Sequence, residues 1–211
     1  MKSNTEWKFW GSHDPLYGVA AWSGKQKDGS EPWTEEEFYA LGMSDWADFE
    51  QVWSRYGRST GRCVEIGCGA GRLTACLADA FAQVDALDIS DEMIRYAQER
   101  VSSPNIRFET IDGLEIPAKN ATVDAVFSTH VFQHFEAYSD AQQYFGEISR
   151  VLKPGGSMMV HLPVYRWPEG AGSAIKMLYR LGRRVSDFKA WIKRTAIRMG
   201  KDAHLMRMTP Y

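Results

Sequence analysis

Residues 64–74, with the sequence VEIGCGAGRLT, limit the possible fold more than any other stretch of this chain. A short apolar run leads directly into three glycines, Gly67, Gly69 and Gly71, and a helical pattern follows. A strand that turns through glycines into a helix places that helix's N-terminus at the carboxyl edge of a sheet, where ligands can lie against the backbone. The turn therefore predicts an α/β fold with a binding site at this edge, and we expect bare backbone N–H groups there.

On both sides of this turn, short β-rich runs alternate with helical patterns. Strands are predicted at 62–67, 83–88, 106–110, 123–128 and 157–164, and helices at 71–81, 90–102 and 139–152. The residues LKPGG at 152–156 have the Pro and Gly chemistry of a turn, so we expect them to separate the last helix from the last strand. Strand followed by helix, repeated, predicts a parallel sheet with crossover helices.

Residues 1–60 are predicted to form a separate, helical and aromatic-rich N-terminal cap, since six of the eight tryptophans lie there. Thr34 and Glu37 have the spacing of a capping box, which starts a helix. A second helix is predicted from Ser44 to Gly57, because aromatic residues recur there at helical spacing: Trp46, Phe49, Trp53 and Tyr56. We expect this aromatic face to pack on the rest of the domain.

Residues 61–163 are predicted to be the core domain and residues 164–211 a basic amphipathic helical segment. Between 173 and 207, ten Lys or Arg residues stand against two Asp, although the formal charge of the whole chain is −2. Three interpretations fit the segment: contact with a membrane surface, contact with an anionic or lipid-linked substrate, or an exposed basic face around an apolar stripe. Nucleic acid is disfavoured as a partner, because no RNA-binding module accompanies the charge.

Length and composition exclude several classes of protein. A chain of 211 residues with 44% hydrophobic residues fits one globular domain, and no apolar run reaches the roughly 18 residues of a membrane span. The amino end lacks the apolar stretch of a signal peptide, so we expect a soluble, cytoplasmic protein. Cys63, Cys68 and Cys76 show no C-x-x-C spacing, which favours buried reduced thiols over a disulfide framework or a zinc site.

Acidic residues at the expected strand ends indicate the charge of the ligand. In a dinucleotide-binding turn a glycine would occupy the position of Arg72, and Glu65 would repel a pyrophosphate. A cationic nucleoside without phosphate, such as S-adenosylmethionine, is favoured instead. Asp88, at the next strand end, suits a ribose diol, and Asp112, after the third strand, suits an adenine amino group. Apolar residues that could hold the ring lie nearby in the sequence: Ile89, Met93 and Ile111 or Leu114.

Five motifs in order, VEIGCGAGRLT, VDALDISDEMI, IRFETIDGLEIP, VDAVFSTHVFQHF and ISRVLKPGG, resemble those of class I S-adenosylmethionine-dependent methyltransferases of the small-molecule type 11 group. The resemblance covers about residues 61–163 and implies a Rossmann-like doubly wound, mostly parallel sheet with helices on both faces. The segment HDPLYGVAAWSGK resembles amino-terminal regions where a helical cap closes over the cofactor. The resemblance implies S-adenosylmethionine as cofactor, bound by Glu65, Gly67, Cys68, Gly69, Asp88, Ile89, Met93, Asp112, Gly113 and His130.

The sequence departs from the family in one respect. The family fold has seven strands and normally finishes with an antiparallel pair, whereas five strands are readable here. We therefore expect the closing antiparallel hairpin to be absent from this chain, and we interpret the chain as a fragment truncated at its carboxyl end, because the exposed sheet edge would favour aggregation. Two alternative functions stay open: an NAD(P)-dependent oxidoreductase on a related sheet, and a non-catalytic cofactor-binding or partner-docking module.

The residues after the fourth predicted strand, STHVFQHF, bear on the methyl acceptor. They contain no N-P-P-Y, D-P-P-Y or Pro-Cys sequence, which disfavours the amide, exocyclic-amine and cytosine acceptors of similar enzymes. We expect a small molecule with an O, N or C nucleophile. His130 and His134 are candidate bases or packing residues, and no metal is expected because no third ligand accompanies them. Three further residues are candidates for the substrate site: Tyr17, Trp22 and His161.

Overall fold

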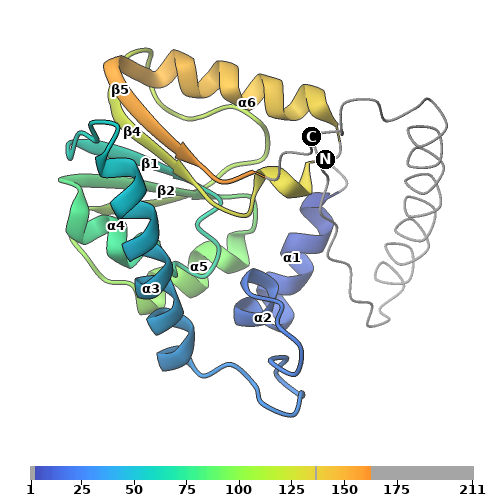
Figure 1. Cartoon of the computed structure of the whole chain (residues 1–211). Coiled ribbons are helices and arrows are strands. Elements are labelled where there is room, and N and C mark those ends of the chain that lie inside the picture. The colour runs from blue at the N-terminus through green and yellow to red at the C-terminus, as the bar shows by residue number, and fades with distance from the viewer. Residues whose placement is uncertain (1–2, 136, 163–211) are drawn as a thin grey trace, which may run out of the picture. The chain divides into compact units, whose positions relative to one another are not determined.

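The computed structural model describes residues 3–135 and 137–162 of the chain (Figure 1). Its helices are α1 (Ser3–His13), α2 (Pro15–Val19), α3 (Glu35–Ser54), α4 (Thr74–Ala80), α5 (Asp91–Arg100), the 3-10 helix η1 (Phe132–His134) and α6 (Tyr138–Val151). Its strands are β1 (Arg62–Ile66), β2 (Gln83–Asp88), β3 (Ile106–Thr110), β4 (Val123–Ser128) and β5 (Leu152–Val160). The predictions for residues 164–211 and for the closing hairpin fall outside the described residues. Within the described ranges, no helix is both long and apolar enough to span a membrane.

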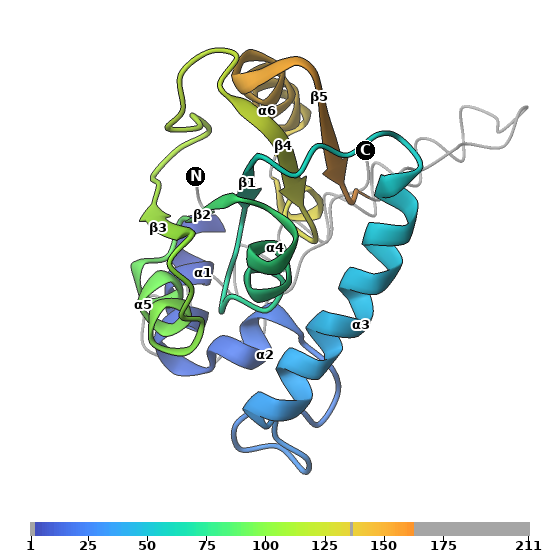
Figure 2. The same cartoon turned by 90° about the vertical axis from the view of Figure 1, so that its left-hand side faces the viewer.

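The strands form one sheet in the order β3-β2-β1-β4-β5, and all neighbouring strands run parallel (Figure 2). The chain builds the sheet from β1 outward to β3 and then returns to the other side of β1 with β4. Right-handed crossovers put the helices of these two halves on opposite faces, and Figure 1 shows α6 across the sheet from α4 and α5. The predicted doubly wound, parallel α/β fold is confirmed. In such sheets ligands bind where the strand order reverses, here between β1 and β4.

The central strands are buried because helices cover both faces of the sheet. β1, β2 and β4 are nearly continuous apolar runs, the pattern expected for parallel strands with no face exposed to water. Their largest fully buried side chains include Val64, Ile66, Val84, Leu87 and Phe127. β3, at the edge, is only partly buried. The core therefore holds the carboxyl ends of β1, β2 and β4 in fixed positions, and the site is built on these ends.

Helix α3 differs in length from the prediction. The capping box is confirmed: the Glu37 N–H donates to Thr34 Oγ1 at 3.2 Å, and the Thr34 N–H donates to Glu37 Oε2 at 3.4 Å. The prediction of a second helix starting near Ser44 is wrong, because one helix continues from Glu35 to Ser54. The sequence between the two predicted helices contains no proline, so local chemistry does not force a break there.

Helix α3 packs on the sheet through the predicted aromatic face. Trp46 and Trp53 are buried, and their rings lie 5.9 and 6.0 Å from the ring of Phe127 in β4. The Trp53 indole N–H donates to Ser157 Oγ of β5 at 2.9 Å. Tyr56, predicted on the same face, is 77% exposed because the helix ends before it. The N-terminal segment therefore covers the sheet as part of its core.

Strand β5 begins earlier than predicted. Leu152 already pairs with Val123, and Ser157 pairs with Ala125, so residues 153–156 form an irregularity within the strand rather than a turn before it. Gly155 has a φ of +80°, which a glycine adopts without strain. LKPGG has the residue types of a turn, but parallel pairing with β4 on both sides of it makes the whole segment part of β5.

Candidate functional site

Three carboxylates lie along the carboxyl edge of the sheet. Glu65 is in β1, Asp88 ends β2, and Asp112 comes two residues after β3. Because β3, β2 and β1 are parallel neighbours, their carboxyl ends share one edge, and the sequence prediction that these acids belong to one rim agrees with the strand order. Glu65 is buried at 3% exposure, Asp88 is half-buried and Asp112 is exposed. The rim thus carries acidic groups at three depths.

The Glu65 carboxylate accepts a hydrogen bond from Thr74 Oγ1, in the first turn of α4, at 2.6 Å. Burial raises the pKa of Glu65 to about 7; the Thr74 hydrogen bond opposes this shift, the charge of Asp88 adds to it, and the charge of Arg72 opposes it. Near neutral pH the group is therefore balanced between its neutral and ionised forms. A cation placed beside it would favour the ionised form.

The Asp88 carboxylate ties the end of β2 to the glycine turn. Its Oδ2 accepts from the Gly69 N–H at 2.8 Å, and its Oδ1 accepts from the Ser90 N–H at 2.9 Å. Ser90 in turn caps α5 by accepting from the Met93 N–H. Burial raises the pKa of Asp88, and these backbone hydrogen bonds oppose the shift. A carboxylate can accept about four hydrogen bonds, so Asp88 retains acceptor capacity for ribose hydroxyls.

The backbone of the glycine turn is already hydrogen-bonded within the chain. The N–H groups of Gly67 and Cys68 both donate to Leu87 O, at 2.7 and 2.9 Å, and the Gly71 N–H donates to Cys68 O. With the Gly69 N–H on Asp88, these donors are not available to a phosphate. The expectation of bare N–H groups at the turn is therefore wrong for these positions, and a carboxylate-lined rim fits a cationic nucleoside better than a pyrophosphate.

The glycines of the turn face side chains of this chain. A Cβ on Gly67 would lie 2.2 Å from Val131 Cγ2, and a Cβ on Gly69 would lie 2.7 Å from Val19 Cγ2. Both glycines also have a positive φ, +77° and +52°, which disfavours any other residue. The sequence indicated that a ligand lies against the backbone of this turn. In the structure, Val19 of α2 and Val131, in the segment after β4, cover part of that backbone.

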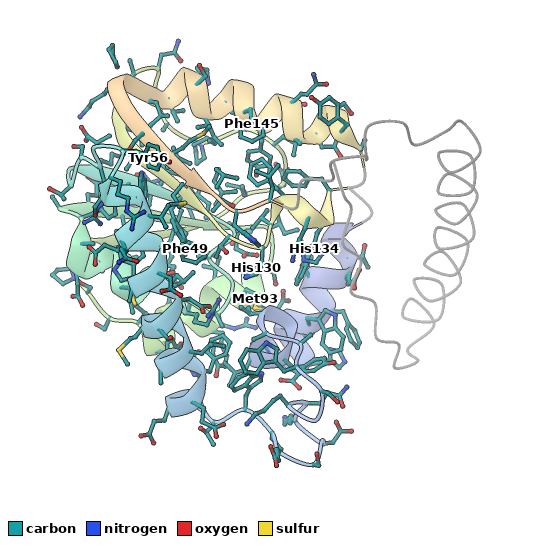
Figure 3. All side chains as sticks on the ribbon, in the orientation of Figure 1. Phe49, Tyr56, Met93, His130, His134 and Phe145 are labelled. Carbon is teal, nitrogen blue, oxygen red and sulfur yellow. The ribbon has the colours of Figure 1, made fainter. Side chains whose placement is uncertain are left out.

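The cap also packs on the glycine turn and on Met93, one of the predicted cofactor residues. The Tyr39 hydroxyl donates to Ala70 O at 2.9 Å. Met93 is 1% exposed and belongs to one buried cluster with Trp10 and Tyr17. Of the candidates for the substrate site, Tyr17 is thus buried in the core of the cap, whereas Trp22 is 54% exposed and its ring lies 5.1 Å from that of Trp33. Figure 3 shows Met93 below His130 in the middle of the molecule.

The histidines after β4 lie apart from one another. The ring of His130 lies 4.8 Å from that of His161, which follows β5, while the ring of His134 lies 4.9 Å from that of Trp7 in α1 (Figure 3). His130 has a φ of +59°, outside a helical conformation, so the i, i+4 spacing does not place both rings on one helix face. No group of three potential metal ligands occurs in the part of the chain that the structure describes.

His130 has the properties of a proton acceptor. His130 is an exposed residue, but partial desolvation of its ring lowers its pKa; His161 and Arg72 lower the pKa further, although Asp45 and Gln133 oppose the shift. The imidazole is therefore neutral at physiological pH and can accept a proton. The nearby Thr129 Oγ1 is buried without a hydrogen-bond partner among the described residues. Nothing in the local sequence pattern around Thr129 indicates burial of its hydroxyl, so this residue could not be predicted as part of the site.

The remaining predicted cofactor residues lie along the β2 and β3 ends. Ile89 is half-buried after Asp88, and the Ile111 N–H donates to Asp88 O at 2.8 Å. The Gly113 carbonyl accepts from the Tyr144 hydroxyl of α6 at 3.3 Å. The segment that carries Asp112 is thus fixed to β2 on one side and to α6 on the other.

The raised pKa of Glu65 gives a test of the site without any ligand. Below pH 4.5 the group is neutral in both states; as pH rises from 4.5 to about 7 the unfolded chain releases the proton while the folded chain keeps it. The free energy of unfolding therefore falls as the pH rises from 4.5 to about 7, by on the order of 3 kcal/mol in total. We expect the melting temperature of the wild type to fall between about pH 5 and 8 relative to that of Glu65→Gln, as measured by circular dichroism. Parallel curves for the two proteins would contradict this.

The doubly wound sheet, the glycine turn and the acidic rim define a class I S-adenosylmethionine-dependent methyltransferase domain. A family model described as a methyltransferase domain, of type 11, matches residues 64–160, the part of the chain that carries the five motifs. The family predicted from the five motifs is confirmed.

Individual proteins support the same assignment. A malonyl-[acyl-carrier protein] O-methyltransferase of Hahella chejuensis is 36% identical over 98 residues, 46% of this chain and 34% of that protein. A probable S-adenosylmethionine-dependent methyltransferase of Mycolicibacterium smegmatis is 32% identical over 124 residues, 54% of this chain and 46% of that protein. The chain thus spans less than half the length of these relatives. A phosphoethanolamine N-methyltransferase of Haemonchus contortus, solved with S-adenosylhomocysteine, shares the fold with a TM-score of 0.56 at 20% identity over 75% of this chain and 31% of that chain.

Proposed function

We propose that this protein transfers a methyl group from S-adenosylmethionine to an O, N or C nucleophile of a small molecule. The observation that carries the proposal is the acidic rim: Glu65, Asp88 and Asp112 follow one another across three neighbouring parallel strands. Within a domain of this family, that rim favours a cationic nucleoside. The hydrogen-bonded backbone of the glycine turn disfavours the alternative, a dinucleotide-dependent oxidoreductase.

The chain's own residues would bind and align the cofactor. Asp88 would receive the ribose hydroxyls, Asp112 the adenine amino group, and Glu65 the methionine ammonium, while Met93 and Ile89 would contact the ring. The bound cofactor supplies an electrophilic methyl group on a positively charged sulfur. Methyl transfer is an in-line displacement, in which the acceptor's lone pair forms the new bond as the carbon–sulfur pair returns to sulfur. The protein therefore contributes alignment, exclusion of water and, where the acceptor carries one, removal of a proton.

His130 is the residue we propose for proton removal. Its neutral imidazole lies at the end of β4, beside the reversal point of the sheet, and His161 flanks it. We assign His134 to acceptor positioning, because it lies against Trp7 of the cap. Trp22 is a weaker candidate for acceptor contact, since its ring contacts Trp33 instead.

Replacing each histidine separately should distinguish these roles. We expect His130→Ala to lower kcat about 100-fold, the typical contribution of a general base, with a smaller change in cofactor affinity. His134→Ala should instead raise KM for the acceptor, because it removes a positioning contact. Turnover of His130→Ala at the wild-type rate would exclude His130 as the base, but would leave the methyltransferase assignment intact. The measurement is steady-state release of S-adenosylhomocysteine as a function of acceptor concentration.

The proposed function is tested by calorimetry and turnover. We expect S-adenosylmethionine and S-adenosylhomocysteine to bind with micromolar affinity, and NADH not to bind. A metabolite panel should then identify acceptors by the release of S-adenosylhomocysteine. Binding of NADH without binding of S-adenosylmethionine would contradict the proposal. Cofactor binding without turnover on any acceptor would support a non-catalytic binding module instead.

We also propose that the protein acts in the cytoplasm. Its three cysteines are free, as expected in a reducing compartment. The acceptor is a small molecule, and the ten basic residues between 173 and 207 would favour an anionic or lipid-linked one. Sedimentation with vesicles containing an anionic lipid, compared with neutral vesicles, tests whether the basic residues favour an anionic or lipid-linked acceptor.

A further inference from the structure

Arg72, at the end of the glycine turn, is a buried cation. It is 5% exposed, and its guanidinium forms an ion pair with the Asp45 carboxylate of the cap helix α3. Burial of an unpaired arginine in this position would be strongly unfavourable, so the pair with Asp45 compensates a charge that the fold places inside. The Asp45 side chain is 34% exposed, which makes it the partner closer to water.

Helix α3 lies directly on Arg72. A Cβ on Gly42 would lie 2.5 Å from Arg72 O and 2.6 Å from Arg72 Cγ, so only a glycine allows this approach. The guanidinium also lies 6.0 Å from the ring of Phe38, one turn earlier in the helix. Together with the Tyr39 hydroxyl on Ala70, these contacts place one face of α3 along the glycine turn.

The Arg72 charge acts on groups on both sides of the turn. It lowers the pKa of Glu65 at the cofactor rim and that of His130 after β4. Asp45 raises the pKa of His130 and so opposes Arg72 there. The charged group that faces Glu65 from β2 is Asp88, and the Thr74 hydroxyl of α4 donates a hydrogen bond to Glu65. Neutral thiols also lie near Glu65: Cys63, Cys68 and Cys76.

We propose that Asp45 and Arg72 are positioning residues of the cofactor site: Asp45 holds and neutralises the Arg72 guanidinium, and the pair makes cap helix α3 part of the site in which Glu65 receives the cofactor. This inference rests on the proposed function. It assigns a role to Arg72, which stands where dinucleotide-binding turns have a glycine, and to Asp45, which lies far from the glycine turn in the sequence.

Single and double variants separate this electrostatic role from a role in folding. Asp45→Asn leaves the Arg72 cation uncompensated, which favours ionised Glu65, so the pH midpoint for binding of S-adenosylhomocysteine should move down by roughly half a unit or more. Arg72→Met removes the cation, so the midpoint should move up by a similar amount. The double variant restores local neutrality, and its midpoint should return toward that of the wild type. A loss of folding alone would weaken binding without moving the midpoint in opposite directions.

The control variant is Glu35→Gln. Glu35 of α3 pairs with Arg100 of α5 at 2.6 Å and so also joins the cap to the core. Unlike Arg72, the Glu35 side chain is 53% exposed. We expect no shift of the binding midpoint in this variant. Calorimetric titration of each protein with S-adenosylhomocysteine between about pH 5.5 and 8.5 gives the midpoints. If the wild type binds but Asp45→Asn and Arg72→Met share its midpoint, this inference alone is overturned; if the wild type does not bind, the proposed function is overturned and the inference with it.

Discussion

Replacing Asp88 by alanine should weaken the binding of S-adenosylhomocysteine by about 100-fold or more. The substitution removes both acceptors for the ribose hydroxyls, and a hydrogen bond to a charged group contributes about 1.5–3 kcal/mol. It also leaves the Gly69 and Ser90 N–H groups without their acceptor, so the turn and the start of α5 lose a shared anchor. Calorimetry at pH 8 measures the loss directly.

The matched control for this prediction is Asp85→Asn. Asp85 lies on the same strand, is 5% exposed and pairs with Arg62 at 2.6 Å, away from the carboxyl edge. We expect this change to lower the melting temperature but to leave the affinity within about threefold of the wild type. Folded Asp88→Ala protein that binds as tightly as Asp85→Asn would remove Asp88 from the cofactor site.

The parallel sheet and its acidic rim were predictable because each depends on short-range pattern. Apolar runs such as VEIG and VDALD show where strands lie, and a parallel sheet requires that their carboxyl ends share an edge. The positions of Glu65 and Asp88 on that edge follow directly. Thr34 and Glu37 likewise specify a helix start by a local pair of hydrogen bonds.

Features that depend on tertiary contacts were not predictable in the same way. Helix α3 continues through Ser44, and Gly42, just before that position, packs on Arg72, a residue distant in the sequence. The separation of His130 from His134 results from a positive φ at His130, which the sequence STHVFQHF does not indicate. The sequence shows Arg72 as a departure from a glycine pattern, but its burial depends on contacts with α3 that the pattern does not indicate, among them the ion pair with Asp45.

The glycine turn itself combines a local and a tertiary requirement, and one substitution tests both. Gly67→Ala would place a Cβ 2.2 Å from Val131 Cγ2 at a φ of +77°. The left-handed conformation costs a non-glycine residue about 1–2 kcal/mol, and overpacking adds about 1–3 kcal/mol. We therefore expect the free energy of unfolding in urea to fall by about 3 kcal/mol, with loss of cofactor binding as the turn shifts.

Gly57→Ala isolates the conformational part of this effect. Gly57 has nearly the same φ, +78°, but no atom lies within 4 Å of its Cβ position, so this variant should lose only about 1–2 kcal/mol. Adding Val131→Ala to Gly67→Ala removes the atom that the new Cβ meets and should recover part of the difference between the two glycine variants. Equal losses for Gly67→Ala and Gly57→Ala would mean that Val131 moves aside freely, and the turn would then owe its glycine to backbone conformation rather than to the close approach of the segment after β4.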